Sequence, residues 1–418
     1  MIWFIQFLII SLFIRSNVYF GNTAISLLNV LNFIAIIYIA FAFKLKISKN
    51  FSTILLIILF FIFIELLYIF CFYNNINQFK ELYYSSFIFT LFILIYWGVK
   101  NYQIKFIKIT FNTIYYIYWV MLFIVIFEII TKQHLPASKG SVDKGFADYP
   151  TAFFYNPNDF ATVIGLFFPF IYYVSIIIKK KIQIKIIAIL SLFFIITSLS
   201  RMALLMLLLM PLFIFFINKK FNKLFFVFLV GTCFLAFLIS ANFKFFKNEN
   251  NLIYRDANKL LTIIKPPKSV NQNNAASLIN NIRFSVYKEI IVSPEKYIIG
   301  GGFLASGKLY EKHIIPLENP HSYWIEGIID FGYIGFLPII FLILFPLLLS
   351  IRNFNKDTLY KYFLIQIIYF IVLLNVPSSV MSLPIIWLPI AFFYALLFNI
   401  HLYKENPNLT NAINKNKI

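Results

Sequence analysis

Charged side chains are scarce in this chain of 418 residues: only 12% of its residues are charged, while 61% are hydrophobic. Soluble globular chains carry about 25% charged residues. The mean hydropathy is +0.84. This composition excludes a soluble globular protein and predicts an integral membrane protein.

Cysteine is nearly absent as well. The two cysteines, Cys71 and Cys233, both lie in apolar runs, where a free thiol behaves as a small hydrophobic group. No disulfide framework is expected. The first apolar run, from Ile2 to Ile14, has no basic residues before it and no small-residue cleavage site after it. We therefore expect an uncleaved first span and not a removed signal peptide.

Apolar runs long enough to cross about 30 Å of hydrocarbon recur along the whole chain. They predict an all-α, polytopic integral membrane protein in which residues 1–418 form a single transmembrane domain of about 12 helices. The predicted spans are residues 3–20, 22–43, 51–73, 83–99, 109–131, 160–178, 184–199, 201–217, 223–241, 322–350, 359–376 and 380–400. The seventh and eighth are short for two separate crossings, and the count is eleven if they form one.

Basic residues are unevenly distributed between the two sides of these spans. Alternate connections and the C-terminal tail hold 19 of the 36 basic residues, but only Asp357 and Glu405 of the 16 acidic ones. The positive-inside rule therefore predicts that both termini lie in the cytoplasm. Nucleic-acid binding would require the basic residues to gather on a water-facing surface, so no nucleic-acid partner is expected.

The opposite, outer face has a medium loop at residues 132–159 and a long extracytoplasmic loop at residues 242–321. The long loop is the one polar stretch large enough to hold a folded element, so chemistry on the outside is sought there.

Part of the long loop has helical periodicity. Apolar residues recur at spacings of three and four at Ile279, Ile282, Val286 and Ile290, and Ser293 and Pro294 then end the pattern. We predict an amphipathic helix that lies on the outer membrane interface and holds Arg283 close to the membrane surface.

Ionisable residues also occur where the predicted span 322–350 begins. Glu326 and Asp330 are four residues apart and so share one helix face. An ionised side chain at the membrane centre costs about 2.5–3.5 kcal/mol and usually faces a cavity or a partner. His321, just before this helix, can accept a proton from a hydroxyl near neutral pH. A wetted interfacial face and a simple helix cap are the plain structural alternatives.

The order His321, Ser322, two aromatic residues, Glu326, Asp330, Gly332, Gly335 resembles a known signature. It is similar to the His-Asn-x-x-Leu-x-x-x-x-Glu-x-Gly-x-x-Gly pattern of the O-antigen ligase and polymerase superfamily, bacterial membrane glycosyltransferases that act on lipid-linked glycans. The preceding "ENPH" looks like the form found in the branch that includes teichuronic acid polymerases.

Three further segments are similar to the family in the same order. "ITSLSRMALL" carries Arg201, "NIRFSVYKEII" carries Arg283, and "YIIGGGF" resembles the glycine turn that follows. "FYNPNDFATVIG", residues 154–165, looks like an Asn-Pro-Asn segment of some members. Together the segments cover residues from about 150 to 340.

The chain departs from the family pattern at three positions. Ser322 stands where the family usually has Asn, Ile325 where it has Leu, and Met202 where it has Gly. A serine hydroxyl replaces one hydrogen bond of an asparagine side chain but not both its donor and its acceptor geometry. The geometry around His321 is therefore expected to differ.

The resemblance implies a metal-independent, inverting transfer from a glycan on undecaprenyl pyrophosphate. Arg201 and Arg283 would stabilise the negative charge on the leaving diphosphate, and His321 would accept the proton from the attacking sugar hydroxyl. An arginine that snorkels at the interface is the alternative for Arg201, and a solvated charge is the alternative for Arg283.

Four neighbouring residues are candidates for substrate binding. Glu326 or Asp330 would orient His321, and Tyr323 and Trp324 would offer a stacking platform for sugar rings. An interfacial aromatic belt explains the two aromatic residues nearly as well. Arg15, Glu65 and Glu128 lie in or near other spans, where pairing inside the bundle is one expectation.

No cofactor or metal is expected. His313, Glu318 and His321 lie near one another in sequence, but their spacings cross Pro316 and Pro320 and match no helical pair of metal ligands. The glycine run at 300–302 could form an amide nest for phosphate, although a plain turn is the favoured interpretation. Neither the Walker nor the dinucleotide-binding spacing occurs.

The preferred hypothesis is a polymerase that joins lipid-linked repeat units at the extracytoplasmic face of the bacterial cytoplasmic (inner) membrane, with a flippase and a chain-length regulator as candidate protein partners. A ligase that transfers polysaccharide to lipid A core would use the same chemistry with another acceptor. A transporter or flippase predicts duplicated halves with interrupted helices, and none are evident. A purely structural assembly partner would not need Arg201, Arg283 and His321.

Overall fold

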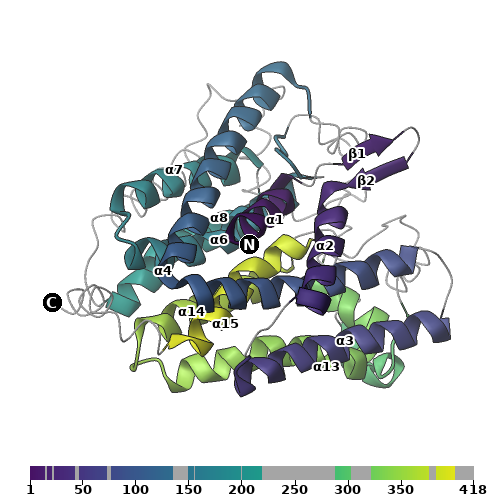
Figure 1. The fold of residues 1–418 in the computed structure, drawn as a ribbon. Helices are drawn as coiled ribbons and strands as arrows, with labels where there is room; N and C mark the ends of the chain where they lie inside the picture. The colour runs from purple at the N-terminus through teal and green to yellow at the C-terminus, as the bar shows by residue number, and fades with distance from the viewer. Residues whose placement is uncertain are drawn as a thin grey trace, which may run out of the picture.

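The computed structural model describes residues 1–14, 17–20, 23–42, 47–72, 77–134, 149–154, 156–198, 200–218, 288–302, 322–375 and 383–400. Its α-helices are α1 (Ile2–Ile14), α2 (Leu27–Ala42), α3 (Lys49–Phe72), α4 (Asn77–Thr131), α6 (Pro157–Ile177), α7 (Lys181–Ser198), α8 (Arg201–Asn218), α13 (Tyr323–Arg352), α14 (Thr358–Leu373) and α15 (Leu388–Phe398). Two short 3-10 helices, η4 (Pro294–Tyr297) and η5 (Pro384–Trp387), one hairpin and a helical turn at residues 288–292 are also described. The predicted helical fold class is confirmed (Figure 1).

Several of these helices suit a membrane. In the described part of the chain, five are long and apolar enough to cross it: Lys49–Cys71, Leu82–Thr131, Pro157–Ile177, Lys181–Ser198 and Tyr323–Arg352. Shorter apolar helices cover Ile2–Ile14, Asn29–Ile39, Met202–Ile214, Thr358–Leu373 and Pro384–Phe398. A multi-pass membrane protein is therefore supported, whereas the predicted count of twelve is not tested. The predicted span 223–241 and most of the loop 242–321 lie outside the described residues.

Helix α4 contains two of the predicted spans. It extends from Asn77 to Thr131 and consists of two helical arms that meet at Gln103, which has φ 46° and ψ −128°, a conformation outside the helical region. The two arms of α4 meet at an angle there (Figure 1). The predicted spans 83–99 and 109–131 fall on either side of Gln103, and their separation into two crossings stays a prediction.

The N-terminal boundary was predicted incorrectly. Residues 3–20 were expected to form one span and 22–43 the next, but α1 ends at Ile14 and an antiparallel hairpin of β1 (Asn17–Phe20) and β2 (Thr23–Ser26) follows. The two strands are separated by Gly21 and Asn22, a dipeptide typical of two-residue hairpin turns. Because long apolar runs flank this dipeptide, the sequence was interpreted as two membrane spans and not as a hairpin.

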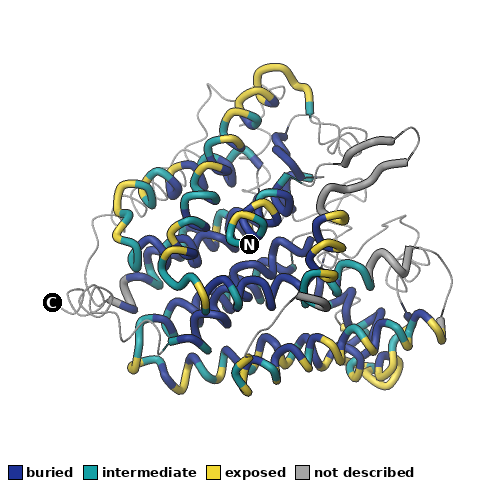
Figure 2. The backbone as a smooth tube through the Cα atoms, in the orientation of Figure 1, coloured by how far each residue is buried: buried dark blue, intermediate teal, exposed yellow. Residues whose placement is uncertain are grey.

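The centre of the bundle is formed by α6, α14 and α15. Of the apolar window in α6, 83% is buried, and α6 packs against α7, α8 and α14. Residues 388–397 of α15 are all buried. Figure 2 shows the buried residues concentrated in the middle of the bundle. A helix that is apolar on all sides is expected at such a position.

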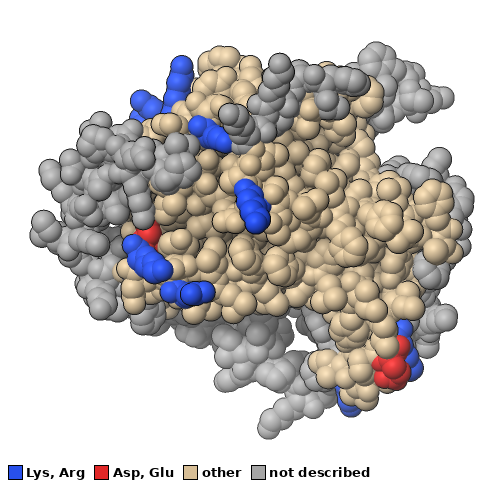
Figure 3. All heavy atoms as spheres, turned by 60° about the horizontal axis from the view of Figure 1, so that its bottom comes forward, with Lys and Arg blue, Asp and Glu red and all other residues tan. Residues whose placement is uncertain are grey.

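The periphery is apolar as well. Exposed side chains include Phe60 and Phe63 on α3, Phe123 on α4, and Phe341 and Leu348 on α13. Figure 3 shows a face on which few charged side chains interrupt the uncharged surface. Soluble monomers rarely expose apolar surface on this scale, whereas contact with lipid chains favours it.

Candidate functional site

The start of α13 is docked onto the end of α14. Three consecutive residues make this contact: the Ser322 hydroxyl donates to Asn375 Oδ1 at 3.1 Å, the Tyr323 amide donates to the Leu374 carbonyl at 3.0 Å, and Trp324 Nε1 donates to the Ile371 carbonyl at 3.1 Å. The last carbonyls of a helix have no partner within the helix. Here the incoming helix supplies donors to them, so the two helix ends stabilise each other.

Helix α8 begins near the same place. A Cβ built on Gly165 of α6 would lie 3.8 Å from Ala203 Cβ of α8 and 3.0 Å from Leu373 Cδ1 of α14. The Tyr369 hydroxyl of α14 also donates to the Met206 carbonyl of α8. The first turns of α8 and the last turns of α14 are therefore neighbours, and the end of α14 contacts the start of α13.

Of the predicted catalytic residues, only the backbone of Arg201 is described. Arg201 is the first residue of α8, and its side chain lies outside the description. Arg283 and His321 lie outside the described residues. His321 directly precedes Ser322, the N-cap of α13. The predicted convergence of the three side chains therefore stays a prediction.

The aromatic candidates are packed against protein. Tyr323 is only 1% exposed, and its ring contacts Phe336 edge-on at a centroid distance of 5.4 Å. Trp324, half-buried, packs on Tyr323 at 6.0 Å. This packing favours a structural role for the Tyr323 ring. Its predicted role as a sugar platform, like that of Trp324, is not tested.

Buried carboxylates lie behind Tyr323. Glu326 and Asp330 are both buried in α13, and Glu326 lies within electrostatic range of the Tyr323 hydroxyl together with Glu65 of α3. Glu65 is fully buried and accepts a hydrogen bond of 2.6 Å from the Ser85 hydroxyl of α4. Glu128 and Arg15 were the expected partners of Glu65 in the bundle. Glu128 instead contacts His134, and Arg15 lies outside the described residues.

Helix α13 is broken just after Asp330. Gly332 has φ 70° and ψ 177°, and the segment 298–302 fills the break. The Gly301 amide donates to the Ile329 carbonyl and the Gly302 amide to the Asp330 carbonyl, both at 2.9 Å, while the Ile334 amide donates to the Ile298 carbonyl at 3.2 Å. The loop backbone thus replaces helical hydrogen bonds that the break removes. We call this contact the glycine joint.

The glycine joint decides between the two interpretations of the glycine run. The amides of Gly301 and Gly302 are engaged by carbonyls of α13, so these two amides do not form a phosphate nest. Tyr68 of α3 closes the joint, because its hydroxyl contacts the Phe331 carbonyl at 2.7 Å and also the Ile299 carbonyl. The segment is a turn with a packing role, which is the favoured interpretation.

The predicted amphipathic helix is described only in its last turn. Residues 288–292 are helical and the helix ends before Ser293 and Pro294, as predicted. Ile290 is buried and its carbonyl accepts a hydrogen bond of 2.9 Å from Tyr333 of α13. This residue therefore packs on protein and not on lipid. Ile279, Ile282, Val286 and Arg283 lie outside the described residues.

Tyr297 follows in η4. Burial and the neighbouring Glu289 carboxylate raise the pKa of Tyr297 to about 12, because both disfavour the phenolate. Its hydroxyl therefore stays protonated at physiological pH. Glu289 also forms an exposed ion pair with Lys296 at 3.7 Å.

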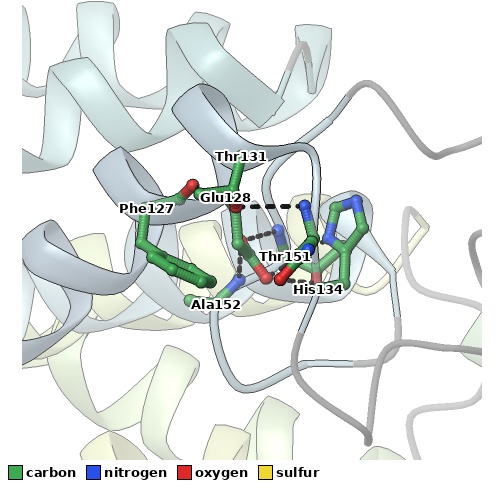
Figure 4. Close-up of polar contacts among 7 residues, drawn as sticks. Phe127, Glu128, Thr131, His134, Thr151 and Ala152 are labelled. Carbon is green, nitrogen blue, oxygen red and sulfur yellow. Dashed lines mark hydrogen bonds and ion pairs between the residues drawn. The ribbon is translucent and has the colours of Figure 1, made fainter.

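A second polar cluster lies at the end of α4 (Figure 4). Glu128 accepts hydrogen bonds from the amides of Thr151 and Ala152, both at 2.9 Å, and lies 3.2 Å from His134 Nδ1. The side chains of Glu128 and His134 are both almost fully buried. Of the three ionisable residues singled out in the spans, Glu128 thus pairs with a histidine and a loop backbone.

This cluster anchors the chain just before α6. Asn156 is the N-cap of α6, its Oδ1 accepts from the Asp159 amide at 2.8 Å, and Pro157 is the first helical residue. Asparagine at the N-cap, proline at N1 and an acidic residue in the first turn all favour a helix start. The "NPND" segment is therefore a helix-initiation signal.

Metal ligands do not gather among the described residues: no group of three or more His, Cys, Asp or Glu side chains could hold an ion there. His313, Glu318 and His321 lie outside that part of the chain.

Comparison with known proteins gives one match. The family model described as O-antigen ligase matches residues 186–340, a stretch that contains Arg201, Arg283, His321 and the glycine joint. No curated protein matches the chain. The motifs that carried the resemblance fall almost entirely within the matched stretch. Residues 186–340 are thus similar to the O-antigen ligase family.

Proposed function

We propose that the protein is a multi-pass glycosyltransferase of the bacterial cytoplasmic membrane that polymerises oligosaccharide repeat units linked to undecaprenyl pyrophosphate. The reaction takes place on the extracytoplasmic face, and both termini lie in the cytoplasm. The match to the O-antigen ligase family over residues 186–340 supports this class of activity. The apolar helices suit a protein whose donor and acceptor are both held in the bilayer.

In the proposed reaction, His321 accepts the proton of a sugar hydroxyl on the acceptor while that oxygen attacks C1 of the donor sugar. The bond from C1 to the pyrophosphate oxygen breaks, and its electron pair leaves with undecaprenyl pyrophosphate. One displacement inverts the configuration at C1. Arg201 and Arg283 bind the leaving diphosphate through charge-assisted hydrogen bonds, so the reaction uses no metal and no nucleotide sugar.

The observation that carries the proposal is that three helix ends lie close together: the start of α13, the end of α14 and the start of α8. The residue after His321 is bonded to Asn375 at the end of α14, and the first turn of α8, which starts at Arg201, packs near Leu373 of α14. This arrangement supports a common site for Arg201 and His321, although the two residues are 120 positions apart in sequence.

Glu326 and Asp330 are proposed to orient His321 and the substrate. Both carboxylates are buried on the first half of α13, where an ionisable group is costly without a partner. Trp324, which is half-buried, is proposed to line the substrate side of the same helix start, and the buried ring of Tyr323 is proposed to support it from behind.

The ligase is the second candidate, because the description of the matched family model names it. It would transfer finished polysaccharide to lipid A core. The chemistry at C1 would be the same, and only the acceptor would differ.

Reconstitution of the purified protein with a lipid-linked repeat unit tests the proposal. The wild-type protein is expected to lengthen the glycan on its carrier with no added metal or nucleotide sugar. Arg201→Ala, Arg283→Ala and His321→Ala are each expected to abolish elongation at normal protein level. Arg352→Ala is the matched control, because it removes an exposed arginine from the last turn of α13 and should leave elongation unchanged.

A parallel reaction offers lipid A core as the acceptor. Transfer to lipid A core without lengthening of the glycan would favour the ligase. Addition of the candidate chain-length regulator is expected to narrow the length distribution made by a polymerase. Full polymer from all three alanine variants would overturn the assignment of an enzyme.

A further inference from the structure

Building on the proposed function, we infer that Asn375 at the end of α14 is a positioning residue for His321. It supplies, from another helix, an asparagine side chain next to the serine that stands where the family signature has asparagine. The inference rests on hydrogen bonds between Asn375, Ser322 and the carbonyls of α14.

Both the nitrogen and the oxygen of the Asn375 side-chain amide are hydrogen-bonded. Its Nδ2 donates to the Ile371 carbonyl at 3.1 Å and to the Val372 carbonyl at 3.3 Å, and its Oδ1 accepts from the Ser322 hydroxyl at 3.1 Å. Two carbonyl neighbours require the nitrogen on that side. The amide orientation is therefore determined by the network, and its oxygen must face Ser322.

Ser322 transmits this constraint to His321. Its hydroxyl has one proton to donate, and donation to Asn375 fixes the rotation of the Cβ–Oγ bond. The next two residues are held by the Leu374 and Ile371 carbonyls. His321 directly precedes Ser322 in the sequence, so the residue that carries the imidazole is joined by a peptide bond to an anchored residue.

A simple helix cap is the competing explanation for Asn375. Asparagine at a helix end commonly donates to a carbonyl of the last turn, and Asn353 at the end of α13 does so, with Nδ2 2.9 Å from the Leu349 carbonyl. Asn353 is a matched control, because it makes the same kind of contact and is not bonded to the segment that follows His321. A cap alone predicts equal consequences at both positions.

The test is a double-mutant cycle in the reconstituted elongation reaction. Asn375→Ser and Ser322→Ala are each expected to lower kcat by about 10- to 100-fold, because small displacements of a reacting group have such effects. KM for the lipid-linked donor should stay unchanged. The double variant should be no slower than the slower single variant, because both substitutions remove the same bond. Asn353→Ser should match the wild-type kcat even if it lowers the melting temperature.

Losses that multiply in the double variant, or a wild-type kcat in Ser322→Ala, would overturn the inference. Ser322→Ala leaves both bonds from Asn375 to α14 in place, so it is decisive even if Asn375→Ser folds poorly. His321→Ala separates this outcome from failure of the proposed function. If His321→Ala is inactive while Asn375→Ser and Asn353→Ser are equally active, only the positioning role is wrong.

Discussion

Gly300 and Gly332 face each other with their backbones in direct contact. A Cβ built on Gly300 would lie 2.4 Å from the Gly332 nitrogen, and a Cβ built on Gly332 would lie 2.6 Å from the Gly300 nitrogen. Real Cβ atoms do not come so close to backbone. The two residues also have φ values of 80° and 70°, which only glycine adopts readily. The segment 298–302 is thereby joined to α13.

Gly332→Ala is expected to be severely destabilising. Its φ and ψ place it in a region that is essentially restricted to glycine, where a side chain costs about 1–3 kcal/mol, and the overlap with the backbone at 298–300 adds to this cost. Gly165→Ala is the control, because its Cβ would lie 3.0 Å from Leu373 Cδ1, the end of a flexible side chain, and contact no backbone atom among its nearest neighbours. Thermal unfolding in detergent should give a clearly lower melting temperature for Gly332→Ala. Equal melting temperatures would refute the close contact.

Tyr68→Phe tests the third member of the glycine joint. The substitution removes the hydroxyl that donates to the Phe331 carbonyl, and loss of one partner from a buried polar group costs about 1–3 kcal/mol. Tyr116→Phe is the matched control, since Tyr116 is 65% exposed. Denaturant unfolding should show the loss of stability for Tyr68→Phe alone. If both variants unfold alike, Tyr68 does not stabilise the joint.

Most of the helical architecture could be predicted from the sequence, because lipid requires long apolar runs. The break between the two arms of α4 fell where Lys100, Lys105 and Lys108 interrupt the apolar pattern. The break at Gly332 was not predicted, since the residues on both sides remain apolar. Only the tertiary contact with residues 298–302 distinguishes it from an ordinary helical glycine.

The candidate site was predictable only in part. The motifs identified His321 and the shared face of Glu326 and Asp330, because helical spacing reports which residues are neighbours within one helix. Contacts between distant segments leave no such pattern. In the sequence, Asn375 is only the residue that ends an apolar run. Its hydrogen bond with Ser322 depends on the packing of α13 against α14.

Glu128→Ala is expected to release the loop that precedes α6. The substitution removes the acceptor for the buried amides of Thr151 and Ala152, which should cost about 2 kcal/mol or more. Glu128→Gln keeps one side-chain oxygen as an acceptor and should be less harmful. Limited proteolysis should cut the segment 132–156 faster in Glu128→Ala.

The control for this experiment is Glu295→Ala, which removes an exposed acidic residue of η4. Its cleavage rate should equal that of the wild-type protein. Protection of the loop in Glu128→Ala at the wild-type level would show that Glu128 does not anchor it.

Chelation of divalent metal ions is expected to leave elongation unchanged. In the proposed mechanism, two arginines stabilise the leaving diphosphate and replace the metal ion that such a charge would otherwise need. The reconstituted reaction should therefore run at the same rate with an excess of EDTA. A loss of activity that added magnesium or manganese restores would contradict metal independence.

The most direct test of the central claim is one turnover of the purified protein in liposomes, with a lipid-linked repeat unit as both donor and acceptor. We predict that the wild-type protein forms a glycan of two units with inverted configuration at C1 and releases undecaprenyl pyrophosphate, and that His321→Ala at equal protein level forms neither product. A two-unit glycan from His321→Ala at the wild-type rate would contradict the account.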